Sequence, residues 1–567
     1  QPVGGQVHRF WVNRQVKRRS GEGPLKLLGS LTKNTNMTRN CILQSASSLV
    51  DIVRAWAEKD SDRPYLSFLP DGSVEGAVDW TYGRLDLRAR AIAAAIQDSG
   101  QAEGRPVLLM LPPGPDFIAA FFACLYARAI AVPMVPPGLA RLSRSFPRLV
   151  GIIADSGASL ILSSSRFRSA IQEMAGRLES GLHIRQLEVD RIADEQSGQW
   201  RRPDLQPDTL GWLQYTSGST SNPKGVMVSH GNIIANLQSI VQSMELDAMD
   251  VNVSWLPPFH DMGLVGGILV CAYLGSRLVS MPPMAFLRRP ACWFEAVTHY
   301  RAYATGGPNF SLDLCCEKIT DRQLERIDLS SLRVFYCGSE AVRLQSVTCF
   351  LDRFTRRAGL KRECFYPCYG LAENTLFATG GYIDPAAHGT ACLDSAAYAE
   401  GRVSLVDGDT KNAIPLVSCG APGPEIDVRI VDPQSGVEQG EGQLGEIWLR
   451  GPSVALGYWR QQDASAMVFA ARIAGNGDGP FMRTGDLGFF LQGHLYISGR
   501  CKEMIIINGR NFFPQDIEQS VLQAVSGLER NGAAAFGVEV SGSEGLVVVF
   551  ETGMAAAETR ESPTSYR

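Results

Sequence analysis

The sequence contains no long apolar run and no strong excess of charge of either sign. Its longest apolar stretch, 117–127, is shorter than the roughly 20 residues that an α-helix needs to cross a bilayer. The formal net charge of −4 over 567 residues argues against a broad nucleic-acid footprint. Internal repeats and low-complexity tracts are missing too. What remains is the composition of a soluble globular protein, long enough for more than one domain.

Paired metal-binding or disulfide spacings are also absent. The chain has 13 cysteines but no C-x-x-C pair, and neither the adjacent Cys315 and Cys316 nor the more widely spaced Cys364 and Cys368 forms a metal framework. We therefore expect reduced core thiols in a cytoplasmic protein. The basic segment 1–36 lacks the apolar core of a secretory signal. We interpret residues 1–46 as an extension or linker, with a basic interaction tail as the alternative.

From residue 47 the chain alternates amphipathic helices and short apolar strands, a pattern typical of parallel sheets covered by helices. The expected elements include a helix at 82–97, a strand at 107–111, a helix at 116–126 and a strand at 130–135. The fold class is thus α/β, with a large domain over 47–500. After residue 500 the pattern changes to a small α+β domain, 501–567.

The strongest local signal is a loop rich in hydroxyl groups and glycine that precedes Lys224-Gly225. It consists of Thr216, Ser217, Gly218, Ser219, Thr220, Ser221, Asn222 and Pro223. Backbone amides and hydroxyls in such a loop can donate to phosphate oxygens, and Lys224 adds a positive charge. A mobile Ser/Gly linker is the alternative, but strand-like segments bracket the loop closely. The order differs from a Walker A loop, and a strand follows instead of a helix.

This loop resembles the signature of adenylate-forming enzymes, which include acyl-CoA synthetases, luciferases and adenylation domains. Further segments fit the resemblance in the same order: Gly338-Ser339-Glu340, Tyr369-Gly370-Leu371-Ala372-Glu373, Thr484-Gly485-Asp486 and Gly499-Arg500-Cys501-Lys502. The resemblance implies that the first of these segments lies against adenine and that Tyr369 packs on it. It also implies that Glu373 binds Mg²⁺, that Asp486 and Arg500 hold ribose, and that Lys502 is a hinge. Alone, each could instead be a solvated carboxylate or a polar turn.

A second group of motifs resembles one branch of that family, the fatty acyl-AMP ligases. These motifs are His260-Asp261-Met262-Gly263, within 255–264, and Pro308-Asn309-Phe310, which follows two glycines. The resemblance implies that both segments contact the substrate and that His260 orients the fatty carboxylate or the α-phosphate. A buried, hydrogen-bonded histidine that only shapes the pocket is the alternative for His260. Segment 380–418 lies where this branch carries its characteristic insertion.

The resemblance implies a reaction with ATP and Mg²⁺ that converts a medium- or long-chain fatty acid to its acyl-adenylate and releases pyrophosphate. Lys224, Glu373 and His260 would be the catalytic residues. The acyl group would then pass to the phosphopantetheine thiol of an acyl carrier protein. One departure concerns the family's lysine near the end of the small domain. The tail 551–567 contains no lysine, so we expect an incomplete small domain. A fatty acyl-CoA ligase and a non-catalytic nucleotide- or acyl-adenylate-binding protein remain the alternatives.

Overall fold

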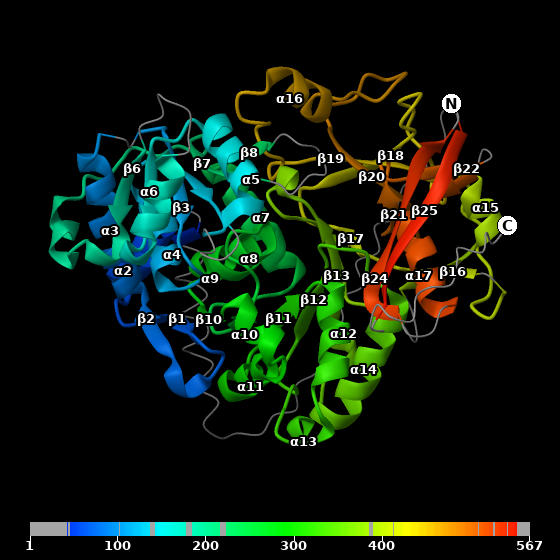
Figure 1. The fold of residues 1–567 in the computed structure, drawn as a ribbon, viewed down its shortest axis with the longest axis horizontal. Coiled ribbons are helices and arrows are strands. Elements are labelled where there is room, and N and C mark those ends of the chain that lie inside the picture. The colour runs from blue at the N-terminus through cyan, green and yellow to red at the C-terminus, as the bar shows by residue number, and fades with distance from the viewer. Residues whose placement is uncertain are drawn as a thin grey trace, which may run out of the picture.

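The computed structural model describes residues 42–43, 46–100, 103–136, 142–176, 184–215, 223–384, 389–411, 413–507, 510–524, 528–540 and 543–552. Helices surround two large sheets, and the C-terminal elements lie at one end of the molecule (Figure 1). Among the described helices, none is long and apolar enough to cross a bilayer. The predicted phosphate-binding residues Thr216, Ser217, Gly218, Ser219 and Thr220 lie outside the described residues, whereas Lys224 is described.

The first sheet has six strands in the order β6-β5-β3-β4-β7-β8 and is parallel except for the pair β7–β8. Its strands are β3 (Pro106–Met110), β4 (Ile130–Pro133), β5 (Leu160–Ser163), β6 (Arg185–Glu188), β7 (Leu210–Tyr215) and β8 (Gly225–Ser229). Neighbouring residues of β3 belong to two different cores, Val107 to one and Leu108 to the other. Both sheet faces are therefore buried, as predicted for parallel strands.

The second sheet has nine strands in the order β17-β14-β13-β12-β11-β9-β10-β1-β2. They are β1 (Pro64–Phe68), β2 (Val78–Thr81), β9 (Val251–Ser254), β10 (Arg277–Ser280), β11 (Ala304–Gly307), β12 (Val334–Cys337), β13 (Phe365–Gly370), β14 (Phe377–Gly380) and β17 (Ala421–Pro422). From β13 to β1 all neighbours are parallel. Parallel neighbours bring their carboxyl ends to one edge of the sheet, where ligands bind in open α/β folds.

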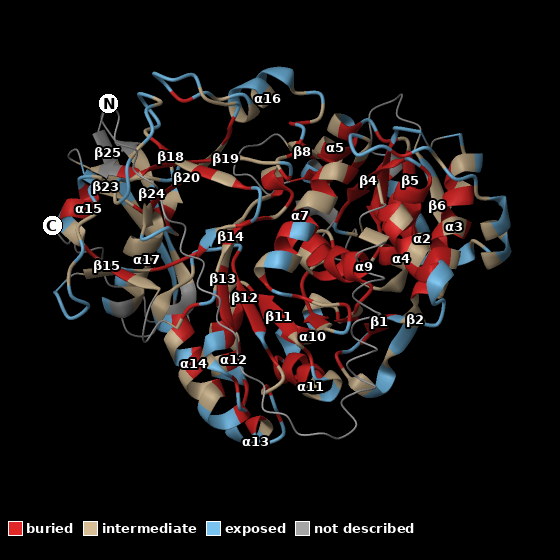
Figure 2. Cartoon of the chain, turned by 180° about the vertical axis from the view of Figure 1, so that it is seen from behind, coloured by how far each residue is buried: buried red, intermediate tan, exposed pale blue. Residues whose placement is uncertain are grey.

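Helices fill the space between the sheets and cover their outer faces. Examples are α2 (Leu49–Lys59), α3 (Tyr82–Asp98), α4 (Pro115–Tyr126), α5 (Leu142–Ser156) and α7 (His230–Ser243). The expected helices at 82–97 and 116–126 correspond to α3 and α4. In α4 every residue from Phe117 to Tyr126 is buried, and the Phe121 ring meets Trp212 of β7 edge-on at 5.8 Å. Figure 2 shows this burial as red helix faces against the sheets.

A third, antiparallel sheet precedes the small C-terminal unit. It consists of β18 (Asp427–Val431), β19 (Gly445–Arg450), β20 (Met482–Leu491) and β21 (His494–Arg500). The C-terminal unit follows with β22 (Ile505–Ile507), β23 (Arg510–Phe512), α17 (Pro514–Ala524), β24 (Leu528–Val540) and β25 (Ser543–Thr552). The predicted domain division at residue 500 thus falls at the end of β21. The α/β class, with a large sheet-and-helix domain and a small C-terminal unit, is confirmed.

Segment 380–418, the candidate insertion, contains an antiparallel hairpin. The pairing runs from Thr390 opposite Val417 to Asp394 opposite Ala413, and its elements are β15 (Thr390–Asp394), α15 (Ser395–Ala399) and β16 (Ala413–Val417). Leu393 and Tyr398 of this hairpin share one apolar cluster with Phe489 of β20 and Phe513 of the C-terminal unit. The Tyr398 and Phe513 rings lie 5.5 Å apart. The hairpin therefore packs on both parts of the molecule at once.

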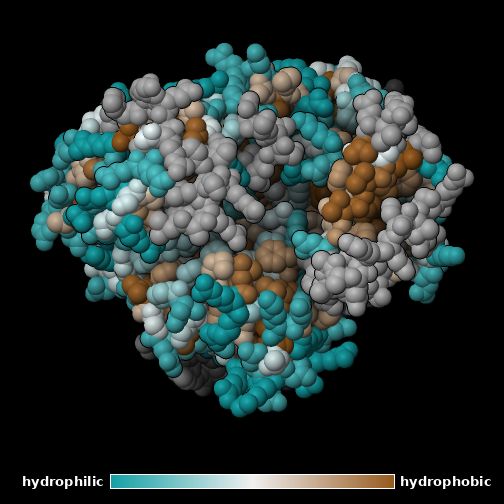
Figure 3. All heavy atoms as spheres, viewed as in Figure 1, coloured by the Kyte–Doolittle hydropathy of each residue, from teal (hydrophilic) through white to brown (hydrophobic). Residues whose placement is uncertain are grey.

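The C-terminal hairpin exposes apolar side chains. Phe536 on β24 and Leu546, Val549 and Phe550 on β25 are all more than two-fifths exposed. They contribute to the brown patch over these strands in Figure 3. A grouped apolar surface of this kind differs from the single exposed apolar residues that are normal on soluble proteins.

The carboxyl group of Asp516, near the start of α17, yields a prediction about stability. Burial raises its pKa to about 7, above the value of an unfolded chain. The native state therefore retains a proton that the unfolded state loses, and the stability of the fold decreases as pH rises from about 4 to 7. We expect Asp516→Asn to add roughly 1–3 kcal/mol of stability near pH 8 and almost nothing near pH 4, a range discounted for partial exposure. Thermal unfolding at both pH values measures this. Glu503→Gln, in an exposed turn, is the control, and an equal effect of Asp516→Asn at the two pH values would contradict the prediction.

Candidate active site

Four neighbouring parallel strands of the second sheet end at the predicted site. β9, β11, β12 and β13 are followed directly by 255–263, 308–310, 338–340 and 371–373. Because these strands are adjacent and parallel, the substrate and adenine segments predicted from separate motifs meet at one edge. The contact between the Ser339 hydroxyl and the Met262 sulfur, at 3.0 Å, joins two of them directly.

The His260 segment forms a tight turn at the start of α8 (Asp261–Gly263). A Cβ at Gly263 would lie 2.1 Å from the Pro257 carbonyl oxygen, so only glycine fits there. The His260 ring nitrogen Nδ1 lies 2.7 Å from the Asp261 carboxylate, and the ring is 55% exposed. This hydrogen bond raises the pKa of His260 against the opposing effect of desolvation. The exposed ring does not match the alternative of a buried structural histidine.

The Pro308–Phe310 and Gly338–Glu340 segments brace each other. The backbone amide of Phe310 donates to Glu340 at 2.6 Å, and the Phe310 ring packs edge-on against Trp255. Asn309 is fully buried, with its amide bonded to the Ser346 hydroxyl and to the Arg343 amide. The structure therefore gives Asn309 a bracing contact between helices, whereas Phe310 remains a candidate for substrate contact. Ser339 adopts a left-handed φ of 69°.

The predicted nucleoside residues come together although they are far apart in the sequence. Asp486 on β20 lies opposite Arg500 on β21, with Oδ1 3.3 Å from the guanidinium Nε. Tyr369, at the end of β13, donates its hydroxyl to Asp486 Oδ2 at 2.6 Å. Burial raises the pKa of Asp486, while the Tyr369 hydrogen bond and the Arg500 charge oppose that shift. One carboxylate between a ring and a guanidinium suits a ribose diol.

The buried Glu446 fixes the turn that presents Asp486. Its Oε1 accepts from the Gly485 amide at 3.1 Å, and its Oε2 accepts from Arg483 and from the indole of Trp448. The role of Glu446 in this arrangement is structural. Lys502 lies exposed in the turn between β21 and β22, where a hinge residue is expected, and its role stays a prediction.

A second group links Lys224 to Glu373 through Tyr458. The ammonium group of Lys224 lies 4.8 Å from the centre of the Tyr458 ring, and the Tyr458 hydroxyl donates to Glu373 Oε1 at 2.9 Å. Burial raises the pKa of Glu373, and the Asp261 and Asp486 carboxylates raise it further. The loop lysine, the predicted metal ligand and the nucleoside carboxylate therefore belong to one electrostatic group.

Local backbone pairing explains why Tyr458 reaches Lys224. The chain around Gly457 runs beside β8: the Met227 amide donates to the Gly457 carbonyl at 2.9 Å, and the Trp459 amide donates to the Gly225 carbonyl at 2.8 Å. No sequence motif marked Tyr458, since its contact depends on this long-range pairing. The only indication was that its two partners, Lys224 and Glu373, belong to motifs that the sequence did mark.

The turn that carries Glu373 is held by buried asparagines. Asn236 of α7 donates to the carbonyls of Asn374 and Phe377, at 3.1 and 2.9 Å, and Asn374 accepts from the Ser453 hydroxyl at 3.1 Å. A Cβ at Gly370 would lie 1.9 Å from the Leu376 carbonyl oxygen. Satisfied buried amides make such a turn rigid, so Glu373 is positioned in advance of ligand binding.

The donor set around Glu373 fits Mg²⁺ only in part. Among the described residues, no group of three or more His, Cys, Asp and Glu side chains is placed to hold a metal. Mg²⁺ commonly binds through one or two carboxylates together with substrate phosphates and water. Glu373, with its raised pKa and two further carboxylates nearby, is suited to that kind of shared site.

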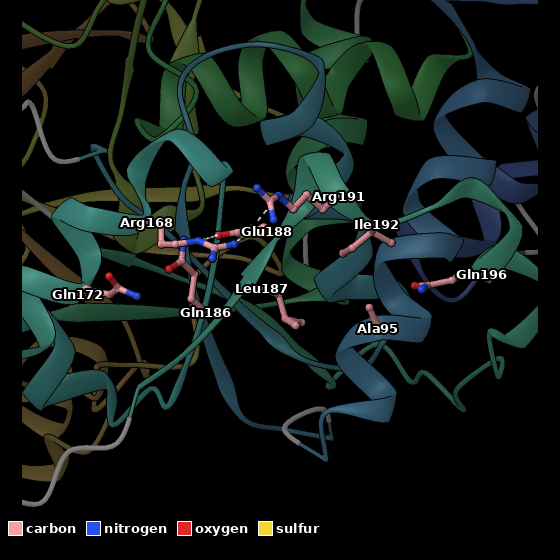
Figure 4. A pocket seen from close by; sticks show the side chains of 9 residues that line it. All are labelled: Ala95, Arg168, Gln172, Gln186, Leu187, Glu188, Arg191, Ile192 and Gln196. Carbon is pink, nitrogen blue, oxygen red and sulfur yellow. Dashed lines mark hydrogen bonds and ion pairs between the residues drawn. The ribbon is translucent and has the colours of Figure 1, made fainter.

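A cavity of about 480 Å³ lies elsewhere, beside α3, α6 (Arg168–Gly176) and β6. Figure 4 shows Arg168 and Arg191 pointing to Glu188, with Arg168 Nε and Arg191 Nε at 2.6 and 3.1 Å from its carboxylate. None of the predicted site residues lines this cavity. Its guanidinium groups already have an anionic partner, so we do not assign it to nucleotide binding.

Comparison with known proteins gives the family. The family model described as AMP-binding enzyme matches residues 53–459. The chain belongs to the AMP-binding enzyme family. It is 40% identical to the medium-chain-fatty-acid–acyl-carrier-protein ligase JamA of Moorena producens (strain JHB), over 89% of this chain and 85% of JamA. It is 33% identical to the long-chain-fatty-acid–AMP ligase FadD32 of Mycobacterium marinum (strain ATCC BAA-535 / M), over 87% and 80% of the two chains.

A solved structure agrees with these sequence relatives. The fatty acyl-adenylate ligase from L. pneumophila, in complex with acyl adenylate and pyrophosphate, matches with a TM-score of 0.76 and 37% identity, over 89% of this chain and 86% of that one. The predicted resemblance to fatty acyl-AMP ligases is thereby confirmed, and this AMP-binding enzyme is assigned to that group. The comparisons assign no individual residue, so the site residues rest on the geometry above.

Proposed function

We propose that this enzyme uses ATP to convert a medium- or long-chain fatty acid to its acyl-adenylate, for transfer to an acyl carrier protein. The observation that carries the proposal is the convergence of Lys224–Tyr458–Glu373 and Tyr369–Asp486–Arg500 at the edge where four parallel strands end. The relatives' names supply the substrate class and the carrier. The cysteines in the described part of the chain are free thiols, which fits a cytoplasmic location.

The proposed reaction brings two anions together. An oxygen of the fatty carboxylate attacks the α-phosphorus of ATP, the bond to the pyrophosphate oxygen breaks, and pyrophosphate leaves. Lys224 and the predicted amides of 216–222 reduce the repulsion between the reactants, and His260, whose pKa is raised, can donate a hydrogen bond to the carboxylate or the α-phosphate. Mg²⁺ near Glu373 would supply additional positive charge on the phosphates. Tyr369, Asp486 and Arg500 orient the nucleoside.

The inserted hairpin bears on the choice of acceptor. Its Tyr398 packs on Phe513 of the C-terminal unit while its strands pack on β20 and β21. We propose that this shared apolar cluster restrains rotation of the C-terminal unit about Lys502 and so disfavours coenzyme A. Incubating the enzyme with ATP, fatty acid and either coenzyme A or a holo acyl carrier protein tests this. Efficient acyl-CoA formation would reject the carrier assignment but not the adenylation step.

We expect Lys224→Ala to lower the rate of acyl-AMP formation about 10- to 100-fold, since a charge-assisted contact to phosphate contributes roughly 1.5–3 kcal/mol. Fatty-acid-dependent pyrophosphate release and direct detection of acyl-AMP measure the effect. Lys318→Ala, in the last turn of α12 (Asn309–Lys318), changes the same charge outside the site and is the control. Equal activity of both variants would show that Lys224 does not contact the substrate phosphates, and no pyrophosphate release by the wild type would reject the proposed function.

A further inference from the structure

Two helices that begin at the site carry a pair of cysteines along their shared face. α12 begins directly after Pro308, and α14 (Leu344–Ala358) follows the Gly338–Glu340 segment. Cys316 lies on α12 and Cys349 on α14, and the Cys349 thiol is close enough to raise the pKa of Cys316. Neither residue belongs to the nucleotide or substrate groups described above.

The contacts on either side of the pair fix its register. About one turn before it, Ser346 of α14 donates to the Asp313 carboxylate of α12 at 3.0 Å. About one turn after it, Arg353 of α14 donates to the carbonyl of Ile319 at 2.6 Å and to the carbonyl of Cys316. Because the three levels follow in the same order on both helices, the helices run parallel and the cysteines face each other. The packing of the two helices therefore brings the thiols to the same level, whichever rotamer each cysteine adopts.

The two thiols differ in their access to solvent. Cys349 is exposed and lines a cavity of about 490 Å³ between α14, the hairpin residue Pro415 and Gln519 of α17. Cys316 is partly buried, and burial together with the Cys349 thiol raises its pKa. A peroxide in the solvent therefore reaches the Cys349 thiol directly, whereas the Cys316 thiol is shielded. Cys349 thus has the character of the attacking thiol and Cys316 that of the resolving thiol.

We propose that Cys316 and Cys349 form an oxidisable dithiol, which a peroxide converts to a disulfide between α12 and α14. The Cys349 thiolate attacks one peroxide oxygen, the O–O bond breaks, and hydroxide leaves, which gives a sulfenic acid. The Cys316 sulfur then attacks the Cys349 sulfur, the S–O bond breaks, and water leaves with the proton of the Cys316 thiol. Two thiols lose two electrons, and the peroxide is reduced to water. A dithiol restores the pair by exchange.

The disulfide would join the two helices whose first residues brace the acyl and adenine segments. Phe310 and Glu340 are bonded at those helix starts, as are Asn309 and Arg343. A covalent link two turns from these contacts limits any rearrangement that substrate entry requires. We therefore expect the oxidised enzyme to form acyl-AMP several-fold more slowly than the reduced enzyme. This last expectation rests on the proposed function, whereas the disulfide does not.

Hydrogen peroxide at a slight molar excess over the full-length chain tests the proposal, with free thiols blocked before proteolysis and peptide mass mapping. The expected result is a linked peptide pair containing Cys316 and Cys349, which dithiothreitol separates. With Cys316→Ser, Cys349 should instead be trapped as a sulfenic acid by dimedone. With Cys392→Ser, a substitution in the inserted hairpin, the linked pair should still form.

Recovery of both cysteines as free thiols, while other cysteines oxidise, would overturn the dithiol. This measurement needs no variant, so a failure of Cys316→Ser to fold cannot obscure it. A linked pair with unchanged acyl-AMP formation would overturn the coupling to the site. A reduced wild-type enzyme that forms no acyl-AMP would instead count against the proposed function.

Discussion

Asp486→Ala should abolish most acyl-AMP formation, with a fall of about 100- to 10,000-fold and a raised KM for ATP. The Asp486 carboxylate is buried between Tyr369 and Arg500. A ribose diol bound to this carboxylate would give two charge-assisted hydrogen bonds. Each such bond contributes roughly 1.5–3 kcal/mol, and each 1.4 kcal/mol corresponds to a factor of ten. The effect should therefore exceed that of Lys224→Ala, which removes a single charge-assisted contact.

A matched variant separates the ribose contact from damage to the site. Tyr369→Phe keeps the ring that would pack on adenine and removes only the hydroxyl that bonds Asp486. We expect this variant to lose about tenfold or less in rate, because the Tyr369 hydroxyl only positions Asp486, whereas the carboxylate itself would contact ribose. Steady-state kinetics with varied ATP distinguish the two variants. Equal losses would mean that the Tyr369–Asp486 bond itself, rather than contact with ribose, is what the reaction needs.

The parts of the site that were predictable from the sequence are those carried by short contiguous motifs. Tyr369 and Glu373 lie in one motif at a strand end, and Asp486 and Arg500 lie in two motifs whose strands pair. The resemblance of these motifs, in this order, to those of adenylate-forming enzymes was enough to place these residues in one site. The apolar periodicity of 82–97 and 107–111 likewise predicted α3 and β3, because period 3.6 and buried strand runs are local properties.

What remained unpredictable depends on contacts between distant segments. Tyr458 joins Lys224 to Glu373 only because the chain around Gly457 pairs with β8, more than 200 residues earlier. The hairpin in 390–417 has alternate apolar positions too weak in pattern to mark strands, yet its cluster with Phe489 and Phe513 stabilises it. Asn309 resembled a substrate contact, and only the structure shows its side-chain amide bonded to Ser346 of α14 and to the Arg343 amide just before that helix. In each of these cases the structure depends on contacts between segments that are far apart in the sequence.

Glu373→Gln should lower acyl-AMP formation about 100-fold or more at saturating Mg²⁺, while Tyr458 keeps an oxygen to which it can donate. The substitution preserves shape and removes charge, so it tests whether the carboxylate acts as an anion. In the wild type, burial and the charges of Asp261 and Asp486 raise the pKa of Glu373. A carboxyl group with a raised pKa ionises only at higher pH, so its anionic function is lost as pH falls through that raised value.

The pH profile then provides the sharper measurement. The wild-type rate should rise with pH along an acidic limb that lies above the range of an ordinary glutamate, and this limb should be missing in Glu373→Gln. Raising the Mg²⁺ concentration should shift the wild-type limb to lower pH, since a cation bound to the carboxylate favours its ionised form, but it should leave the variant unchanged. His260→Gln, measured in parallel, identifies any contribution of the neighbouring imidazole. If the acidic limb persists in Glu373→Gln and responds to Mg²⁺ as in the wild type, the metal contact belongs to another group, and Glu373 acts only through its hydrogen bond with Tyr458.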